Sequence, residues 1–347
     1  PMRRTVAVAA PVARFAIVLR VVVTHNPEDL DAYFGRALPE LRASAEVSLN
    51  PLDRDLTTAE LIEVAAGCDV VVAHRSTPGE AALFDASPSL LAFLRTAVDI
   101  STVDVDAASN HGILVAHADK SFVPSTAEIA LALMLDLARN VSESTVDYRR
   151  GDEPPQRPGF QLRGKVAGVI GYGAIGSYLA DCLRSLGVEV LVADPYADAT
   201  PDGFEQVALA DLLGRADFVL PLAASTDETA HLIDAAALRA MRPGTMLVNV
   251  SRGELLDEDA VAAALDSGHL GGLGMDVGQG ADQRPTAELA ARAGVVATPH
   301  LGGLTPDNAD AQALSAVEQV RAMAAGDLPP RCVNPERASR LRDWWSA

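Results

Sequence analysis

Three glycines near the middle of the chain carry the clearest chemical signal. They stand in Gly171-Tyr-Gly173-Ala-Ile-Gly176, after an apolar run at 166–170 and at the start of a helical stretch at 175–186. Between a strand and a helix, this spacing is typical of dinucleotide binding. The first glycine permits a tight turn, the second lets a pyrophosphate approach the backbone, and the third lets helix and strand pack closely. The alternative is that the glycines serve an ordinary turn.

An acidic residue follows at the distance that such a turn requires. Asp194 stands eighteen residues after Gly176, at the end of the next predicted strand, 189–193. Its carboxylate can accept hydrogen bonds from the ribose hydroxyls, and its charge would repel a 2′-phosphate. The helix that begins after Gly173 adds N–H donors and a partial positive charge for the pyrophosphate. We therefore expect NAD as the cofactor, in preference to NADP.

Two more residues could do chemistry because each follows a predicted strand. Arg252 comes after the strand at 246–250, and His300 comes after the strand at 295–297. Ligands of open α/β sheets bind beyond the carboxyl ends of the strands. A guanidinium can hold a carboxylate through two parallel hydrogen bonds, and an imidazole can exchange a proton near neutral pH. Taken alone, Arg252 could equally be a surface residue on a turn. Other histidines are expected to face solvent or to make ordinary hydrogen bonds: His74, His111, His117, His231 and His269.

Short β-branched runs that alternate with Ala/Leu-rich stretches must position these groups. The first part of the chain has predicted strands at 15–23, 70–73, 90–96 and 113–116, and helices at 27–36, capped by Asn26, and at 58–66. The second part adds strands at 166–170, 189–193, 218–222, 246–250, 272–276 and 295–297. Long helices are predicted at 125–140 and 307–325. This alternation predicts an α/β fold with two Rossmann-like domains, each a doubly wound parallel sheet.

The glycine motif lies in mid-chain, so a first domain must be built before the dinucleotide-binding one. We expect residues 1–120 and 308–347 to form a flavodoxin-like substrate-binding domain, and residues 121–307 to form an NAD-binding Rossmann domain. The two long helices would cross between them. The proline-rich segment 151–159 is expected to be a loop.

Composition narrows the class of partner. The chain has 347 residues, enough for about two domains, with 49% hydrophobic and 22% charged residues, which is ordinary for a globular protein. Its formal charge of −19 disfavours nucleic-acid and membrane-surface binding. Three widely spaced cysteines are expected to be reduced thiols in a cytoplasmic protein, without zinc-ligand spacing, and we expect no metal. Arg14 and Arg20 interrupt the apolar start, so the role of a leader at 1–14 stays open.

Several ordered motifs between about residues 90 and 335 resemble those of the D-isomer-specific 2-hydroxyacid dehydrogenases. Beside the glycine motif they are Leu162-Arg-Gly-Lys165, Asp194-Pro195, Met241-Arg-Pro-Gly-Thr-Met-Leu-Val-Asn249-Val-Ser-Arg252-Gly253, Gly274-Met-Asp276-Val277 and Thr298-Pro299-His300-Leu-Gly302-Gly303. The resemblance implies two α/β domains flanking a cleft, bound NAD, a homodimer, and hydride transfer between a 2-hydroxy acid and its 2-keto acid. It does not name the acid or the physiological direction.

The resemblance also implies roles for single residues. Arg252 would anchor the substrate carboxylate and His300 would be the acid/base. The backbone of Ala174 and Ile175 would meet the pyrophosphate. Residues at other strand ends would line the rest of the cofactor site: Leu222, Val250, Arg252, Asp276 (near the carboxamide), His300 and Gly302. Substrate loops of the first domain would hold Arg75, Thr96 and Ala97, although Ala97 replaces a common glycine.

One catalytic position departs from the family. The family usually places a glutamate after the Asp-Val pair, hydrogen-bonded to the histidine and favouring its protonated form. Here Ala281 stands at that position, and its neighbour Asp282 is the only carboxylate nearby, so Asp282 is the candidate third catalytic residue. The alternatives are that a glutamine serves or that this loop has no catalytic role. The missing glutamate also leaves open an NAD-sensing binding protein of the same fold. An alanine dehydrogenase is disfavoured by the order of Arg252, Asp276 and His300.

Overall fold

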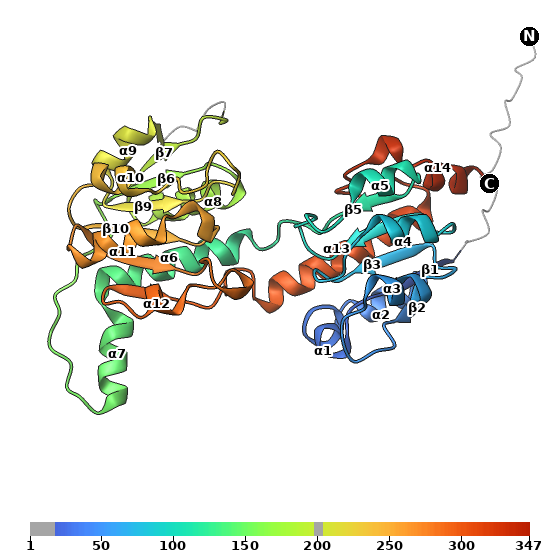
Figure 1. The fold of residues 1–347 in the computed structure, drawn as a ribbon, viewed down its shortest axis with the longest axis horizontal. Coiled ribbons are helices and arrows are strands. Elements are labelled where there is room, and N and C mark those ends of the chain that lie inside the picture. Colours follow the sequence, from blue (N-terminus) through green and yellow to red (C-terminus); the bar gives the residue numbers. More distant parts are fainter. Residues whose placement is uncertain (1–17, 198–203) are drawn as a thin grey trace, which may run out of the picture. The chain divides into compact units, whose positions relative to one another are not determined.

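The computed structural model describes residues 18–197 and 204–347, which fold into two compact units (Figure 1). Of the described residues, those up to Lys120 and Ala309–Ala347 form unit 1, and those from Ser121 to Asn308 form unit 2. The sequence-based division placed these boundaries at 120/121 and 307/308. The leader 1–14 and the first residues of the strand predicted at 15–23 lie outside the described residues.

Unit 1 is built on a five-stranded parallel sheet in the order β2-β1-β3-β4-β5. Its strands are β1 (Leu19–Val23), β2 (Ala45–Leu49), β3 (Val70–Ala73), β4 (Ala92–Arg95) and β5 (Leu114–Ala116). This is the flavodoxin-like order. From β1 the chain adds β2 on one side and then β3, β4 and β5 on the other, so the topological switch point lies between β1 and β3. The sequence analysis missed β2, because exposed Glu46 and Ser48 break its apolar run.

Helices cover both faces of this sheet. They are α1 (Pro27–Asp29), the π-helical η1 (Leu30–Phe34), α2 (Leu38–Arg42), α3 (Thr58–Val64), α4 (Ala81–Ala86), α5 (Val105–Asn110), α13 (Pro306–Ala325), η4 (Pro335–Arg337) and α14 (Ser339–Ser346). The Asn26 side chain caps α1 as expected, and the helix predicted at 27–36 is divided into α1 and η1. Alternate β1 residues face different cores: Leu19, Val21 and Val23 pack with α13, and Val22 packs on the other face.

Unit 2 contains a seven-stranded parallel sheet in the order β12-β11-β10-β9-β6-β7-β8. The strands are β6 (Val166–Ile170), β7 (Glu189–Ala193), β8 (Glu205–Gln206), β9 (Phe218–Pro221), β10 (Thr245–Asn249), β11 (Leu270–Met275) and β12 (Val295–Ala297). Counted from β6, this is the Rossmann order, and its switch point lies between β6 and β9. The predicted α/β class with two doubly wound parallel sheets is therefore confirmed.

The helices of unit 2 again form two layers. They are α6 (Val123–Arg139), α7 (Val141–Arg150), α8 (Ala174–Ser185), α9 (Leu209–Arg215), α10 (Ala235–Ala240), η2 (Gly253–Leu255), α11 (Glu258–Asp266), η3 (Ala281–Gln283) and α12 (Ala287–Ala290). Helices α6 and α8 pack on one face of the sheet, and α9, α10 and α11 pack on the other. Across the described ranges, the structure has no helix with the length and apolar character needed to cross a membrane.

Candidate active site

The glycine motif forms the turn between β6 and α8. Gly171 has φ +97°, and a Cβ there would lie 2.7 Å from the Ala223 nitrogen, so only glycine fits. A Cβ on Gly176 would lie 2.2 Å from the Gly171 oxygen, which explains the close packing of helix on strand. A Cβ on Gly173 would meet nothing within 4 Å, and this residue is exposed. The turn therefore leaves open space where a pyrophosphate must approach the backbone.

The start of helix α8 supplies donors at this turn. Gly173 is the N-cap and has no side chain, so the first N–H groups of the helix, those of Ala174 and Ile175, have no side-chain cap. Leu222 closes the turn from β9, because its N–H donates to the Ile170 oxygen at 2.7 Å. Unpaired N–H groups at a helix start favour an anion. These residues fit the diphosphate of a dinucleotide.

Asp194 lies next to the same turn, at the carboxyl end of β7. Its two carboxylate oxygens accept hydrogen bonds from the N–H groups of Tyr172 at 2.7 Å and Tyr196 at 2.8 Å. The side chain is half-buried, and a carboxylate has about four acceptor positions, so it retains capacity for ribose hydroxyls. The residue thus joins the glycine turn to the carboxyl end of β7, and its predicted contact with the ribose stays a prediction.

His300 is held in an uncommon backbone conformation. Its φ is +61°, in the left-handed region, and its N–H donates to the Asp276 oxygen at 2.9 Å. The ring Nδ1 lies 3.0 Å from the backbone oxygen of Asp282. Because a carbonyl can only accept, Nδ1 is the protonated nitrogen and Nε2 is the nitrogen left to exchange a proton. The side chain is half-buried, so a small ligand can reach it.

Asp276 fixes the loop that carries His300. It is fully buried, and its carboxylate accepts hydrogen bonds from the Thr298 hydroxyl (2.6 Å), the Leu301 N–H (2.7 Å) and the Gly302 N–H (2.8 Å). Three of about four acceptor positions are therefore used inside the protein. Asp276 therefore stabilises the loop that carries His300. Its predicted contact with the carboxamide of the cofactor stays a prediction.

The expected partner of His300 contacts it in a different way. The Asp282 carboxylate is 73% exposed and lies 4.0 Å from the Arg284 guanidinium, while the backbone oxygen of Asp282 makes the contact with the ring. The left-handed backbone of Asp282, with φ +54°, turns its carbonyl toward the histidine. Gln279 donates its amide to the Leu256 oxygen at 3.2 Å, so this glutamine does not replace the glutamate either.

Arg252 follows β10 and is half-buried. One Nη1–H donates to the neighbouring Ser251 oxygen at 2.8 Å, and the backbone oxygen of Arg252 accepts from the Asn249 amide at 2.8 Å. Val250, just before it, is buried and belongs to the core under α6 and α8. The remaining guanidinium donors can hold a carboxylate.

Strand register brings these groups to one edge of the sheet. Asn249 at the end of β10 pairs with Met275 of β11, and Met275 pairs with Ala297 of β12. Arg252, Asp276 and His300 each follow one of these strand ends, so the carboxyl edge of unit 2 carries all three. The glycine turn follows β6 on the same edge.

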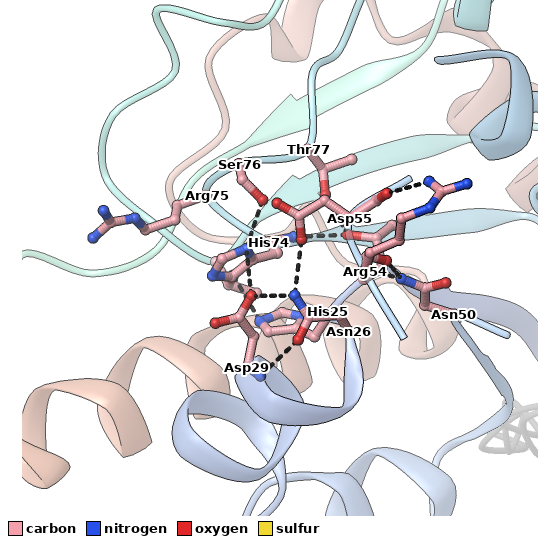
Figure 2. A network of polar contacts seen from close by, with 12 residues as sticks. His25, Asn26, Asp29, Asn50, Arg54, Asp55, His74, Arg75, Ser76 and Thr77 are labelled. Atoms are coloured by element: carbon pink, nitrogen blue, oxygen red, sulfur yellow. Dashed lines mark hydrogen bonds and ion pairs between the residues drawn. The ribbon is translucent and has the colours of Figure 1, made fainter. Parts of the chain in front are cut away.

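The residues of unit 1 that are predicted to contact substrate differ in how exposed they are and in whether their polar atoms are already hydrogen-bonded. Arg75 is exposed, and its side chain extends away from the neighbouring polar network (Figure 2). Thr96 is 8% exposed, and its hydroxyl donates to the Ala73 oxygen at 3.0 Å, so this hydroxyl is engaged inside the unit. The Ala97 oxygen accepts from the Ala118 N–H at 3.2 Å. Arg75 is therefore the side chain most open to a ligand.

The sequence analysis missed a polar network at the carboxyl edge of the sheet in unit 1 (Figure 2). The Asn26 amide donates to Asp29 at 2.8 Å and to Asp55 at 3.0 Å, and His74 Nδ1 lies 3.6 Å from Asp29. Ligand atoms of Asp29, Asp55 and His74 all lie within 4.8 Å of one another, and the Asn26 amide donates one hydrogen bond to each of the two carboxylates. The rule that selected Arg252 and His300 would also have selected Asn26, because it too follows a strand end.

Two buried histidines add to this network. His25 is 2% exposed, and burial, together with the neighbouring His74, lowers its pKa to about 3. Burial also lowers the pKa of His74, while Asp29 and Asp55 raise it. The two rings lie 4.8 Å apart. The expectation that His74 is satisfied by ordinary hydrogen bonds agrees with its contact to the Ser76 hydroxyl at 2.9 Å.

Comparison with known proteins agrees with this geometry. Residues 131–302 match the family model described as D-isomer specific 2-hydroxyacid dehydrogenase, NAD binding domain. The chain is 30% identical to a glyoxylate reductase from Korarchaeum cryptofilum over 309 residues, which covers 87% of this chain and 93% of the relative. The protein is therefore a member of the D-isomer specific 2-hydroxyacid dehydrogenase family, and unit 2 contains its NAD-binding domain.

Other relatives bear different names within that family. The chain is 37% identical over 288 residues to D-3-phosphoglycerate dehydrogenase of Mycobacterium tuberculosis, covering 81% of this chain and 53% of the relative. It thus spans about half the length of these mycobacterial relatives. Among solved structures, apo D-lactate dehydrogenase from Escherichia coli is 27% identical, with a TM-score of 0.76, covering 90% of this chain and 99% of that one.

Proposed function

We propose that the protein is an NAD-dependent oxidoreductase that interconverts a 2-hydroxy acid and its 2-keto acid. The observation that carries this proposal is the carboxyl edge of unit 2. There a glycine turn with open space over Gly173, a guanidinium from Arg252 and an imidazole from His300 all follow strand ends of one sheet. These are the groups that binding a dinucleotide, holding a carboxylate and moving a proton require.

Arg252 is proposed to anchor the substrate carboxylate. Its guanidinium spends one donor on the Ser251 oxygen, so a planar pair of N–H groups is left for two parallel hydrogen bonds. Orienting the carboxylate also orients the adjacent carbon and oxygen on which the reaction takes place.

His300 is proposed as the acid/base at the substrate oxygen. Its Nδ1–H is held by the Asp282 carbonyl, so Nε2 delivers a proton to the keto oxygen in reduction and removes it from the hydroxyl in oxidation. Bound NADH would supply the hydride for the adjacent carbon. The buried Asp276 keeps the His300 loop in place, which makes it a positioning residue for this step.

The partner of His300 bears on a second candidate function. Since a neutral carbonyl, not a carboxylate, holds Nδ1, a protein that senses NAD(H) with little or no catalysis is the alternative. The presence of both Arg252 and His300 on the edge favours the enzyme. The predicted third catalytic role of Asp282 is kept only for its backbone oxygen, and direct substrate contacts of Arg75, Thr96 and Ala97 stay predictions, as do a homodimer and a cytoplasmic location.

A substrate panel separates the two candidates. NADH absorbance should fall when the protein meets one of glyoxylate, pyruvate, hydroxypyruvate, or an aromatic or branched 2-keto acid, and D-3-phosphoglycerate with NAD tests the opposite direction. NADPH run in parallel measures cofactor preference. NADH binding without turnover on every acid of the panel would favour the sensing protein.

A further inference from the structure

Arg95 is a buried cation at the carboxyl end of β4. Its side chain is only 1% exposed, and removing a guanidinium from water is costly unless its donors are paired. Burial lowers the pKa of Arg95 to about 10, partly opposed by the charge of Asp99, so the group stays protonated at neutral pH. The Phe93 ring lies 6.0 Å from it. A cation buried at this cost is expected to have a specific structural or functional role.

One nitrogen of the Arg95 guanidinium, Nη1, serves a single loop, while the buried Nε has no hydrogen-bond partner among the described residues. Its Nη1 donates to the backbone oxygens of His74 (2.6 Å), Arg75 (2.9 Å) and Thr77 (2.8 Å), and its Nη2 donates to the Thr102 hydroxyl. All these partners are carbonyls or a hydroxyl. The guanidinium thus gathers three carbonyls of a four-residue loop around a single charge.

The side chain of Thr24, which follows the neighbouring strand β1, also holds this loop. The His74 N–H donates to the Thr24 hydroxyl at 2.9 Å, and that hydroxyl lies 2.6 Å from the Thr77 hydroxyl. The loop follows β3 at the switch point between β1 and β3, where ligands of this sheet type bind. Arg75 lies in the middle of the loop with an exposed side chain (Figure 2). Arg95 binds the backbone oxygens of His74, Arg75 and Thr77 around it.

We propose that Arg95 is a positioning residue, which holds the loop His74–Thr77 so that Arg75 is presented to the 2-keto or 2-hydroxy acid. This inference rests on the proposed function, because it assigns Arg75 to substrate. Without the guanidinium, three carbonyls would lose a charged donor and the loop would relax. Substrate affinity would then fall, while cofactor binding on unit 2 would be unaffected.

The chain offers a matched control in Arg340. This arginine also lies partly inside unit 1, and its Nη1 donates to the backbone oxygens of Ser87 (2.7 Å) and Leu90 (3.1 Å). Burial lowers the pKa of Arg340 as well. These carbonyls precede β4, at the amino edge of the sheet, whereas Arg95 ends β4 at the carboxyl edge. Arg340→Met therefore tests loss of a carbonyl-binding arginine away from the loop.

The experiment compares Arg95→Met, Arg95→Lys, Arg95→Ala and Arg340→Met in the full chain. For the active keto acid, we expect Arg95→Met to raise KM by about tenfold or more, since hydrogen bonds to a charged group are worth one to two decades. The NADH Kd should stay within about twofold. The KM of Arg95→Lys for the keto acid should lie between those of the parent and Arg95→Met. Millimolar guanidinium should restore part of the affinity of Arg95→Ala for the keto acid. Arg340→Met should lower Tm without changing KM.

Amide hydrogen exchange gives a readout that does not need turnover. The Thr77 N–H donates to the His74 oxygen at 3.0 Å. Its exchange should be faster in Arg95→Met than in the parent protein and should be unchanged in Arg340→Met. Unchanged exchange, or a KM that rises equally in Arg340→Met, would overturn the role of Arg95. If no acid is turned over but exchange rises only in Arg95→Met, the loop role holds, and the proposed function and the Arg75 assignment fail. If Arg95→Met does not fold, the KM of Arg95→Ala with and without guanidinium tests the proposal, and a KM that guanidinium does not lower would overturn it.

Discussion

The two parallel sheets share one architecture, yet their carboxyl edges are built in opposite ways. On unit 2, the switch point between β6 and β9 is lined by backbone, with open space over Gly173. On unit 1, the switch point between β1 and β3 is filled by buried side chains, among them His25 and Arg95. The switch point of unit 2 is made by leaving side chains out, and that of unit 1 by packing polar side chains together.

This difference decides what each edge can do. Backbone N–H groups at a helix start can bind any diphosphate, so the edge of unit 2 suits a common cofactor. A network of side chains has a specific shape and charge, so we propose that the edge of unit 1 selects among substrates. The following predictions test each side of the comparison, in order of decreasing effect.

The largest effect is expected at His300. If Nε2 moves the proton, His300→Ala should lower kcat by about 10²–10⁴-fold, the usual worth of a positioned acid/base. NADH should still bind, because the glycine turn and Asp194 are untouched. Steady-state kinetics and NADH fluorescence titration measure the two quantities. Unchanged kcat would remove the dehydrogenase reaction from this edge.

Arg252→Lys keeps a positive charge and removes the planar pair of donors. Loss of a charge-assisted hydrogen bond costs about 1.5–3 kcal/mol, or one to two decades in kcat/KM for the keto acid. NADH affinity should change far less, which separates substrate anchoring from cofactor binding. An Arg252→Lys protein with the kinetics of its parent on every active acid would exclude Arg252 from the site.

The same contrast explains how much the sequence could predict. The edge of unit 2 is encoded locally, so Gly171, Gly173, Gly176 and Asp194 could be found from their spacing. The strands there were placed within two residues, except the two-residue β8, which the sequence analysis missed. The edge of unit 1 joins residues from five separate segments, and no local pattern connects Asn26 with Asp55 or Arg95 with Thr77. Backbone direction at Asp282 was equally hidden, because a left-handed φ at an aspartate has no spacing signal.

Acid should destabilise unit 1 through its buried histidine. Burial holds the pKa of His25 at about 3, below its ordinary value of 6.5, so the unfolded chain takes up the proton first. Stability is then full above pH 6.5 and is lost as pH falls toward 3, by about 2 kcal/mol at pH 5 from His25 alone. His74, with a pKa lowered by burial, acts in the same direction.

The two tryptophans make this measurable. Trp344 and Trp345 are the only tryptophans in the sequence, and both pack against the core of unit 1. Their fluorescence in urea therefore follows unit 1. His25→Gln should flatten the dependence of the urea midpoint on pH between 8 and 5. An identical slope in variant and parent would mean that His25 takes up its proton in the folded state.

A smaller change is expected in cofactor preference. Asp194→Asn removes the charge that would repel a 2′-phosphate and keeps an oxygen that can accept from the Tyr172 N–H. The ratio of kcat/KM for NADH over NADPH should fall about tenfold, the worth of one charged contact. Equal use of both cofactors by the unaltered protein would contradict the assignment of Asp194 to the ribose.

The smallest effect is expected for Asp282→Asn, although sequence reasoning had given this carboxylate a catalytic part. The carboxylate is 73% exposed, and the contact with His300 comes from the backbone oxygen. Asparagine tolerates the left-handed φ of +54°, so the carbonyl should stay in place and the pH profile of kcat should match the parent. Asp282→Pro is the informative contrast, because proline fixes φ near −65° and must move that carbonyl away from the ring. We expect the proline variant to lose kcat while it keeps NADH affinity and Tm. A shifted pH profile in Asp282→Asn would instead return the charge to the mechanism, and an active Asp282→Pro would leave His300 working without a fixed ring.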